Sequence, residues 1–257
     1  MGIINVTPDS FSDGGVHFDR VVAIDAALRM VEDGASIIDV GGESTRPGAE
    51  PIAVDEELER VIPVIEGIRS KSDVTISIDT RNAATARAAF AAGANILNDV
   101  TALQHDPEIL DAAVEANAPV ILMHMRGTPA TMQSMAKYDD VIDDVLRELA
   151  APVERARHAG LDQVLIDPGI GFAKTFEHNL EILARCDELT RVAPFVIGAS
   201  RKKFIGHLTG REGRERVYGS LATVAAAAAG GASIIRVHDV RETVDFLKVF
   251  MAIEAAR

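Results

Sequence analysis

Two loop-like segments of this chain concentrate side chains that could bind a charged ligand. Residues 5–15 combine an amide, two acids, hydroxyls and the ring of Phe11 with the turn formers proline and glycine. We expect this segment to be a mobile loop that closes over a pocket, although a polar turn without function is the plain alternative. Residues 41–48 place Arg46 in a glycine-rich loop, where exposed backbone N–H groups and a guanidinium could together grip a phosphate.

Three acceptor-bearing residues end short, β-branched runs further along the chain: Asp79, Asn98 and Asp167. A charge in a protein interior is costly without a partner. These groups suit a flat heterocycle with several donors, because a carboxylate accepts two parallel hydrogen bonds from an aminopyrimidine edge and an amide matches a mixed edge. Capping of a neighbouring loop would explain any one of them, but it explains all three together less well. The turn at residues 167–172 adds an aromatic wall, Phe172.

The positive groups come from the last quarter of the chain. Lys202 closely follows Ser200 in a basic loop, residues 200–214, and Arg236 and His238 alternate so that they share one face of a strand. Together with Arg46 they could neutralise a diphosphate or a similar anion. A lysine at such a position could instead form a Schiff base with a carbonyl substrate, an alternative that the neighbouring cations disfavour.

Metal ligands are sparse in the sequence. No His/Glu spacing indicates zinc, and we expect His124, which stands between two methionines, to be a hydrogen-bonded core residue. Asn5 and the acids of its loop could hold Mg²⁺, which prefers oxygen ligands and a phosphate partner.

A repeated pattern must bring these residues together. Strands are predicted at residues 2–7, 36–40, 74–79, 95–99, 119–125, 163–167, 195–199 and 233–237, with amphipathic or alanine-rich helical stretches between them. A strand followed by a helix, eight times over, predicts an α/β fold of the (β/α)₈ TIM-barrel type, in which the carboxyl ends of the strands form the active site. The runs end at Asn5, Gly41, Asp79, Asp99, His124, Asp167, Ser200 and His238. We also expect Asp239 to cap the final helix.

Length and composition restrict the class of protein. The 257 residues fit one barrel without a dividing linker, so we expect a single domain, residues 1–257. A net charge of −13 disfavours unspecific binding to nucleic acid or to an anionic membrane. Cys186 is the only cysteine, which favours a reducing compartment, and no signal peptide or membrane-spanning run is visible. We therefore expect a cytoplasmic protein.

Seven of these segments together closely resemble the dihydropteroate synthases, the folate-pathway enzymes that sulfonamides inhibit: residues 5–15, 41–48, 78–80, 98–99, 167–172, 200–203 and 236–240. The resemblance implies that p-aminobenzoate is joined to 7,8-dihydropterin-6-ylmethyl diphosphate, with release of diphosphate and 7,8-dihydropteroate. It also implies a homodimer. A methyltransferase of the methyltetrahydrofolate type would share the Asp and Asn residues that bind the pterin, but it would need neither cations that bind a diphosphate nor a flexible first loop.

The resemblance assigns roles to individual residues. Asp79, Asn98, Asp167 and Lys202 would hold the pterin, and Asn5 would contact the Mg²⁺ that accompanies the diphosphate. The diphosphate would be gripped by Arg46, Arg236 and His238, with Asp13 brought in by loop closure. The p-aminobenzoate would be surrounded by Phe11, Thr45, Pro47 and Ser200. The predicted catalytic set is Asp13, Lys202, Arg236 and His238, and the predicted reaction is a dissociative substitution.

Overall fold

The strands form the centre of the molecule. The computed structural model describes residues 1–7, 15–44 and 48–257, with the backbone alone described for residues 15–19. The strands among these residues are β1 (Gly2–Asn5), β2 (Ile37–Gly41), β3 (Thr75–Asp79), β4 (Ile96–Asp99), β5 (Val120–Met123), β6 (Val164–Asp167), β7 (Val196–Ile197) and β8 (Ile234–Ile235). The first six pair in parallel in chain order, and β7 pairs in parallel with β8.

Two isolated bridges join these sheets into a ring. Ile166 of β6 pairs with Phe195, just before β7, and Gly2 of β1 pairs with Val237, two residues after β8. The (β/α)₈ barrel predicted from the sequence is therefore confirmed. The last two strands are shorter than predicted, because the residues that flank them make isolated bridges rather than a continuous ladder.

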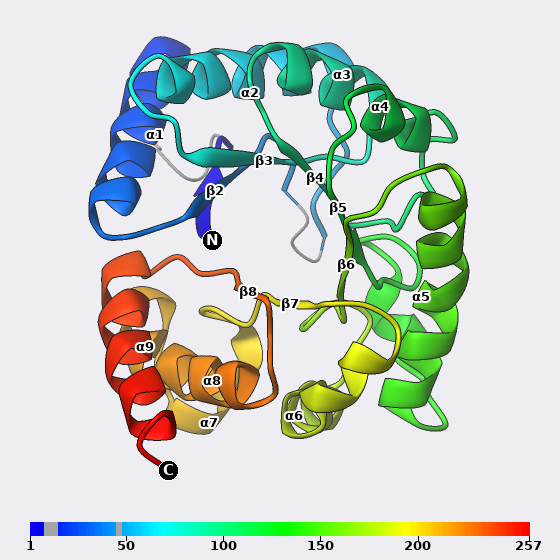
Figure 1. Ribbon diagram of the computed structural model, residues 1–257, viewed down its shortest axis with the longest axis vertical. Coiled ribbons are helices and arrows are strands. Elements are labelled where there is room, and N and C mark those ends of the chain that lie inside the picture. The colour runs from blue at the N-terminus through cyan, green and yellow to red at the C-terminus, as the bar shows by residue number, and fades with distance from the viewer. Residues whose placement is uncertain (8–14, 45–47) are drawn as a thin grey trace.

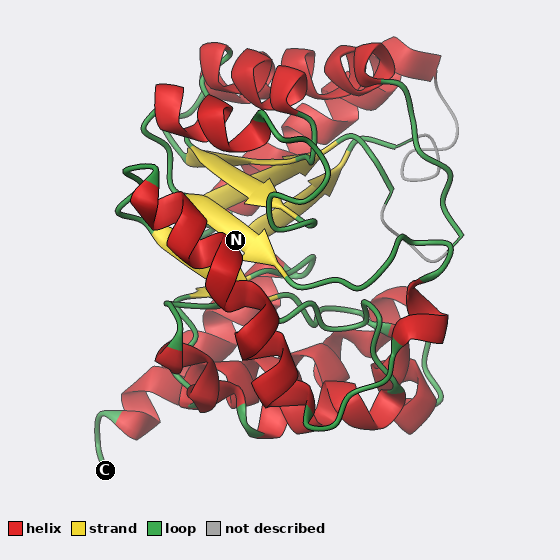
Figure 2. Ribbon diagram, turned by 90° about the vertical axis from the view of Figure 1, so that its right-hand side faces the viewer, coloured by secondary structure: helices red, strands yellow, loops and turns green. Residues whose placement is uncertain are grey.

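Helices surround the strands (Figure 1) and cover their outer face when the molecule is seen from the side (Figure 2). Within the described ranges they are α1 (Gly15–Glu32), α2 (Val54–Arg69), α3 (Ala83–Ala91), α4 (Ile109–Glu115), α5 (Val141–His158), α6 (Phe176–Ala184), α7 (Lys203–Thr209), α8 (Val217–Ala229) and α9 (Val240–Glu254). Helix α7 lies inside the segment predicted as a basic loop, because Phe204 and Ile205 are buried and anchor it. In the described part of the chain, no helix has the length and apolar character that crossing a membrane requires.

Two parts of the apolar core lie on opposite faces of the strands, as strand alternation requires, and a third, small cluster contains Val224, Val237 and Val240. The larger part lies between strands and helices and takes the outward-facing residues, such as Ile38, Val40, Ile76 and Ile78. The smaller part fills the barrel itself, with Ile96, Ile121 and Val196 packed against Met1, Ile37, Leu165 and Ile234. We call these seven residues the inner apolar layer. Polar side chains follow this layer toward the carboxyl ends of the strands.

Candidate active site

A pocket opens above the inner apolar layer, at the carboxyl ends of the strands. It is lined by Asp79, Asn98, Val100, Met123, Asp167, Ile170, Phe172, Gly198, Lys202 and Arg236. Because strand side chains alternate, a residue two positions after a member of the inner apolar layer also faces the barrel interior. The lining residues related to the layer in this way are Asn98, Met123, Asp167, Gly198 and Arg236.

Arg236 links two carboxylates at this pocket. Its Nε donates to Asp39 at 2.6 Å and its Nη2 donates to Asp79 at 2.8 Å. Asp39 is fully buried, and its carboxylate also accepts a hydrogen bond from the amide nitrogen of Asn98 at 3.2 Å. An ionised carboxylate offers acceptors only, so this contact leaves the amide oxygen of Asn98 for the pocket that it lines. The pocket therefore presents acceptors from both Asp79 and Asn98.

Asp79 titrates far from the usual range of an aspartate. Burial raises its pKa to about 7, the guanidinium of Arg236 opposes the rise, and the carboxylates of Asp39, Glu57 and Asp99 add to it. The carboxyl group of Asp79 therefore changes its protonation state near neutral pH. The ability of this position to accept two hydrogen bonds changes with it.

The third acceptor, Asp167, is the last residue of β6, and the aromatic wall, Phe172, comes from the turn that follows this strand. Oδ1 of Asp167 accepts the backbone N–H of Gly169 at 2.7 Å, which closes this turn. Burial raises the pKa of Asp167, while that hydrogen bond and the nearby positive charges oppose the rise. The ammonium of Lys202 lies 4.3 Å from the centre of the Phe172 ring, and burial lowers the pKa of Lys202 to about 8. Lys202 is thus a cation at neutral pH that borders both a ring and a carboxylate.

His238 does not strengthen the positive charge of the site in the way the sequence suggested. Ser200 Oγ accepts the backbone N–H of His238 at 3.2 Å and lies 3.1 Å from its Nδ1. Burial, together with the charges of Arg201 and Arg236, lowers the pKa of His238 to about 3. The imidazole is therefore neutral at pH 7 and can serve an anion as a hydrogen-bond donor rather than as a cation.

Asp239 is the N-cap residue of helix α9, as predicted, but its side chain does not make the expected capping hydrogen bond. Its carboxylate instead forms an ion pair with Arg201, with Nε of Arg201 2.9 Å from Oδ2 of Asp239. The same contact takes Arg201 out of the set of cations available to a ligand.

Several predicted site residues fall outside the described residues: Phe11, Asp13, Thr45, Arg46 and Pro47. Asn5 is described and stands at the carboxyl end of β1, where its side chain has no hydrogen-bond partner among the described residues. The described part of the chain contains no group of three or more His, Cys, Asp or Glu side chains that could hold a metal ion. An amide oxygen such as that of Asn5 could therefore contribute only part of a metal site.

Comparison with known proteins agrees with this geometry. Residues 1–238 match the family model described as "Pterin binding enzyme". Dihydropteroate synthase of Synechocystis sp. is 49% identical over 253 residues, which cover 97% of this chain and 88% of that protein. The chain belongs to the dihydropteroate synthase family of pterin-binding enzymes.

Solved structures of dihydropteroate synthases have the same fold. The Xanthomonas albilineans enzyme with 4-aminobenzoic acid gives a TM-score of 0.93 at 48% identity, covering 99% of this chain and 92% of that one. The Yersinia pestis enzyme in a sulfonamide drug complex gives 0.93 at 45% identity, covering 99% and 94%. These relatives do not favour the methyltransferase and aldolase alternatives.

Sequence reasoning missed two charged residues of this family member. Asp39 lies inside β2 and organises Arg236 and Asn98, and Lys174 lies buried behind the turn after β6. Asp39 carried a usable signal, because it stands two residues after Ile37 and therefore faces the barrel interior. His124 was correctly predicted as a buried, hydrogen-bonded residue: it is 3% exposed and its Nε2 lies 2.9 Å from Glu148.

Proposed function

We propose that this chain is a dihydropteroate synthase that condenses p-aminobenzoate with 7,8-dihydropterin-6-ylmethyl diphosphate to give 7,8-dihydropteroate and diphosphate. The observation that carries the proposal is one pocket lined by three acceptor residues, Asp79, Asn98 and Asp167, and by two cations, Lys202 and Arg236. The similarity to dihydropteroate synthases along the whole chain supports it.

Pterin recognition follows from the acceptors. The aminopyrimidine edge of a pterin carries several N–H donors, which match the oxygens of Asn98 and Asp167. The ring of Phe172 and the ammonium of Lys202 give the flat heterocycle a wall on which to stack. Asp79, when ionised, adds a further acceptor.

Breaking the carbon–oxygen bond places negative charge on the departing diphosphate. Arg236 uses Nε and Nη2 on Asp39 and Asp79, and its Nη1 has no partner among the described residues, so that N–H group remains available for a phosphate oxygen. His238 can donate from its neutral ring, and we assign Arg46 to the same anion. Fixed donors aimed at developing charge are among the largest contributions to catalysis.

The carbon left behind is a cation conjugated with the electron-rich dihydropterin. Asp79 and Asp167 favour that charge through the ring, since both carboxyl groups lie at the pocket. The arylamine of p-aminobenzoate is unprotonated at neutral pH and needs no strong general base. A dissociative substitution is therefore the reaction that these residues suit.

Mg²⁺ is the cofactor that we assign to the diphosphate. The amide of Asn5, which has no partner among the described residues, fits Mg²⁺ as one oxygen ligand, because this ion usually keeps several waters and takes the rest of its ligands from one or two side chains and from phosphates. When bound, the ion would neutralise charge on the leaving group. The chain itself contributes Asn5 and the donors named above.

The test is a coupled assay of diphosphate release with each substrate alone and with both. The proposal expects release that requires both p-aminobenzoate and the pterin diphosphate, and that a sulfonamide inhibits in competition with p-aminobenzoate. No release with both substrates would refute it. Trapping of Lys202 by borohydride with a carbonyl substrate would favour an aldolase instead. A homodimer, a cytoplasmic location and a single domain over residues 1–257 stay predictions.

A further inference from the structure

Lys174 is a buried lysine that does not line the pocket and yet contacts its wall. Burial lowers its pKa to about 7 and the nearby Asp167 opposes this shift, so the amino group is only partly charged at neutral pH. The residue is 3% exposed. Its ammonium donates to the backbone carbonyl of Phe172 at 3.1 Å and lies 3.0 Å from Nδ1 of His124. Neither contact is used in the reaction described above, so the cost of burying this charge needs another explanation.

The turn that forms the wall, residues 167–172, lies between two ammonium groups. A Cβ added to Gly169 would stand 3.5 Å from Nζ of Lys174, and one added to Gly171 would stand 3.6 Å from Nζ of Lys202. Both glycines have positive φ, 70° and 84°, a backbone shape that side chains disfavour. Lys202 lines the pocket and Lys174 does not, so Lys174 supports this turn from outside the lining.

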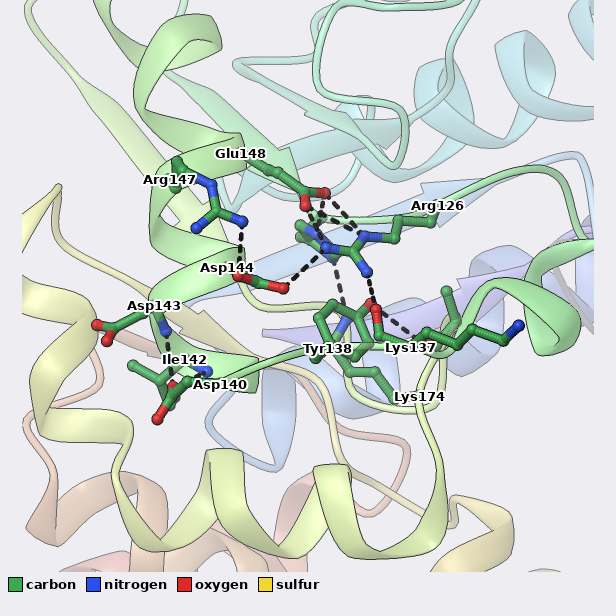
Figure 3. A network of polar contacts seen from close by, with 12 residues as sticks. Arg126, Lys137, Tyr138, Asp140, Ile142, Asp143, Asp144, Arg147, Glu148 and Lys174 are labelled. Carbon is green, nitrogen blue, oxygen red and sulfur yellow. Dashed lines mark hydrogen bonds and ion pairs between the residues drawn. The ribbon is translucent and has the colours of Figure 1, made fainter.

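His124 links Lys174 to helix α5 through two hydrogen bonds. The carboxylate of Glu148 only accepts, so Nε2–H of His124 donates to it at 2.9 Å, and Nδ1 of the neutral ring accepts from the amino group of Lys174. Burial lowers the pKa of His124 to about 4, which agrees with a neutral ring. Glu148 also pairs with Arg126, whose guanidinium lies 3.9 Å from the centre of the Tyr138 ring (Figure 3).

We propose that Lys174 is a positioning residue for pterin binding, which holds the 167–172 turn so that Asp167 and Phe172 meet the pterin. The proposal rests on the proposed function. The charged form of Lys174 also favours the ionised form of the desolvated Asp167. Other contacts hold the same turn, among them the N–H of Gly171 to Asn179 at 2.6 Å. Loss of Lys174 should therefore displace the turn rather than unfold the protein.

The test is steady-state kinetics of Lys174→Met, which removes the charge and the donor but keeps an unbranched side chain. We expect KM for the pterin diphosphate to rise about 10- to 100-fold, the range for loss of a charge-assisted hydrogen bond. KM for p-aminobenzoate should stay within about twofold, since the lost contact touches only the pterin wall. An unchanged pterin KM in folded Lys174→Met, or an equal rise in both KM values, would overturn the proposal.

Arg69→Met is the matched control. Arg69 also holds loop carbonyls with a cation, those of Gly93 at 2.9 Å and Ser72 at 3.0 Å, but these loops precede β4 and β3 at the other end of the barrel. This variant should lower the urea midpoint and leave both KM values unchanged. A pterin-specific rise in Arg69→Met would show that general loosening of the barrel is enough to produce the effect, and would overturn the role of Lys174.

A second pair of variants keeps the test decisive if Lys174→Met does not fold. His124→Asn retains an acceptor for the ammonium of Lys174, whereas His124→Leu retains none. We expect the pterin KM to be higher in the leucine variant, and equal values would contradict the proposal. Wild-type activity separates this failure from failure of the proposed function, because an inactive wild-type enzyme would refute the function itself.

Discussion

Replacing Asp79 by Asn should change how the stability of the ligand-free protein depends on pH. Folding raises the pKa of Asp79 from 3.8 to about 7, because the side chain is only 15% exposed. Between these values the folded protein binds a proton that the unfolded chain has lost, so the free energy of unfolding falls as pH rises. The slope is about 1.4 kcal/mol per pH unit for one group. The destabilisation is complete above pH 7 and is absent below 3.8, the pKa of Asp79 in the unfolded chain.

The Asn variant lacks this titration. From pH 5 to pH 8 its free energy of unfolding should therefore gain about 3 kcal/mol relative to wild type. Urea unfolding of both proteins at pH 5, 6, 7 and 8 measures the difference directly, with the exposed Asp162 changed to Asn as a control for formal charge. Parallel pH curves for wild type and Asp79→Asn would refute the reasoning, since they would mean that folding leaves the affinity of Asp79 for a proton unchanged.

Three further predictions concern the same pocket. The kcat/KM for the pterin diphosphate should depend on pH with a bell-shaped profile. It should fall below about pH 7 as Asp79 is protonated and above about pH 8 as Lys202 loses its proton. A flat profile between pH 6 and 9 would contradict this prediction. Asp39→Asn removes a charged acceptor of Arg236, so kcat/KM should fall about 10- to 100-fold. The acid limb of the pH profile should also move to lower pH, because the charge of Asp39 raises the pKa of Asp79. An acid limb at the same pH as in wild type would contradict this coupling between Asp39 and Asp79. Gly171→Ala would place a Cβ 3.2 Å from Cδ of Lys202, at a residue whose φ is 84°. Titration calorimetry should therefore show weaker pterin binding. An unchanged affinity would mean that the turn tolerates this side chain without displacing Lys202.

The barrel was predictable because its signals are local. Most strands are short, buried runs rich in β-branched residues, and an α-helix follows each strand before the next one begins, so the pattern can be recognised from neighbouring residues alone. Asn98 and Asp167 were predicted at the pocket for the same reason, since the carboxyl end of a barrel strand leads to the active site. The structure places both in the lining.

What the sequence did not reveal depends on distant partners. Asp39 was missed because it lies inside β2 rather than at the end of this strand, and its partner Arg236 stands 197 positions away. The neutral state of His238 follows from burial and from two arginines, and the setting of Lys174 from His124, 50 positions earlier. Strand periodicity gives the direction of a side chain, but the charge that it carries is decided by the folded surroundings.

The most direct test is a crystal structure of the protein with a pterin diphosphate analogue bound. We expect the aminopyrimidine edge to donate to Asn98 and Asp167, the ring to lie against Phe172, and the phosphates to lie beside Arg236 and His238. A pterin bound elsewhere on the barrel, or phosphates placed against Asp167 instead of Arg236, would contradict the assignment of this pocket as the site for the pterin diphosphate.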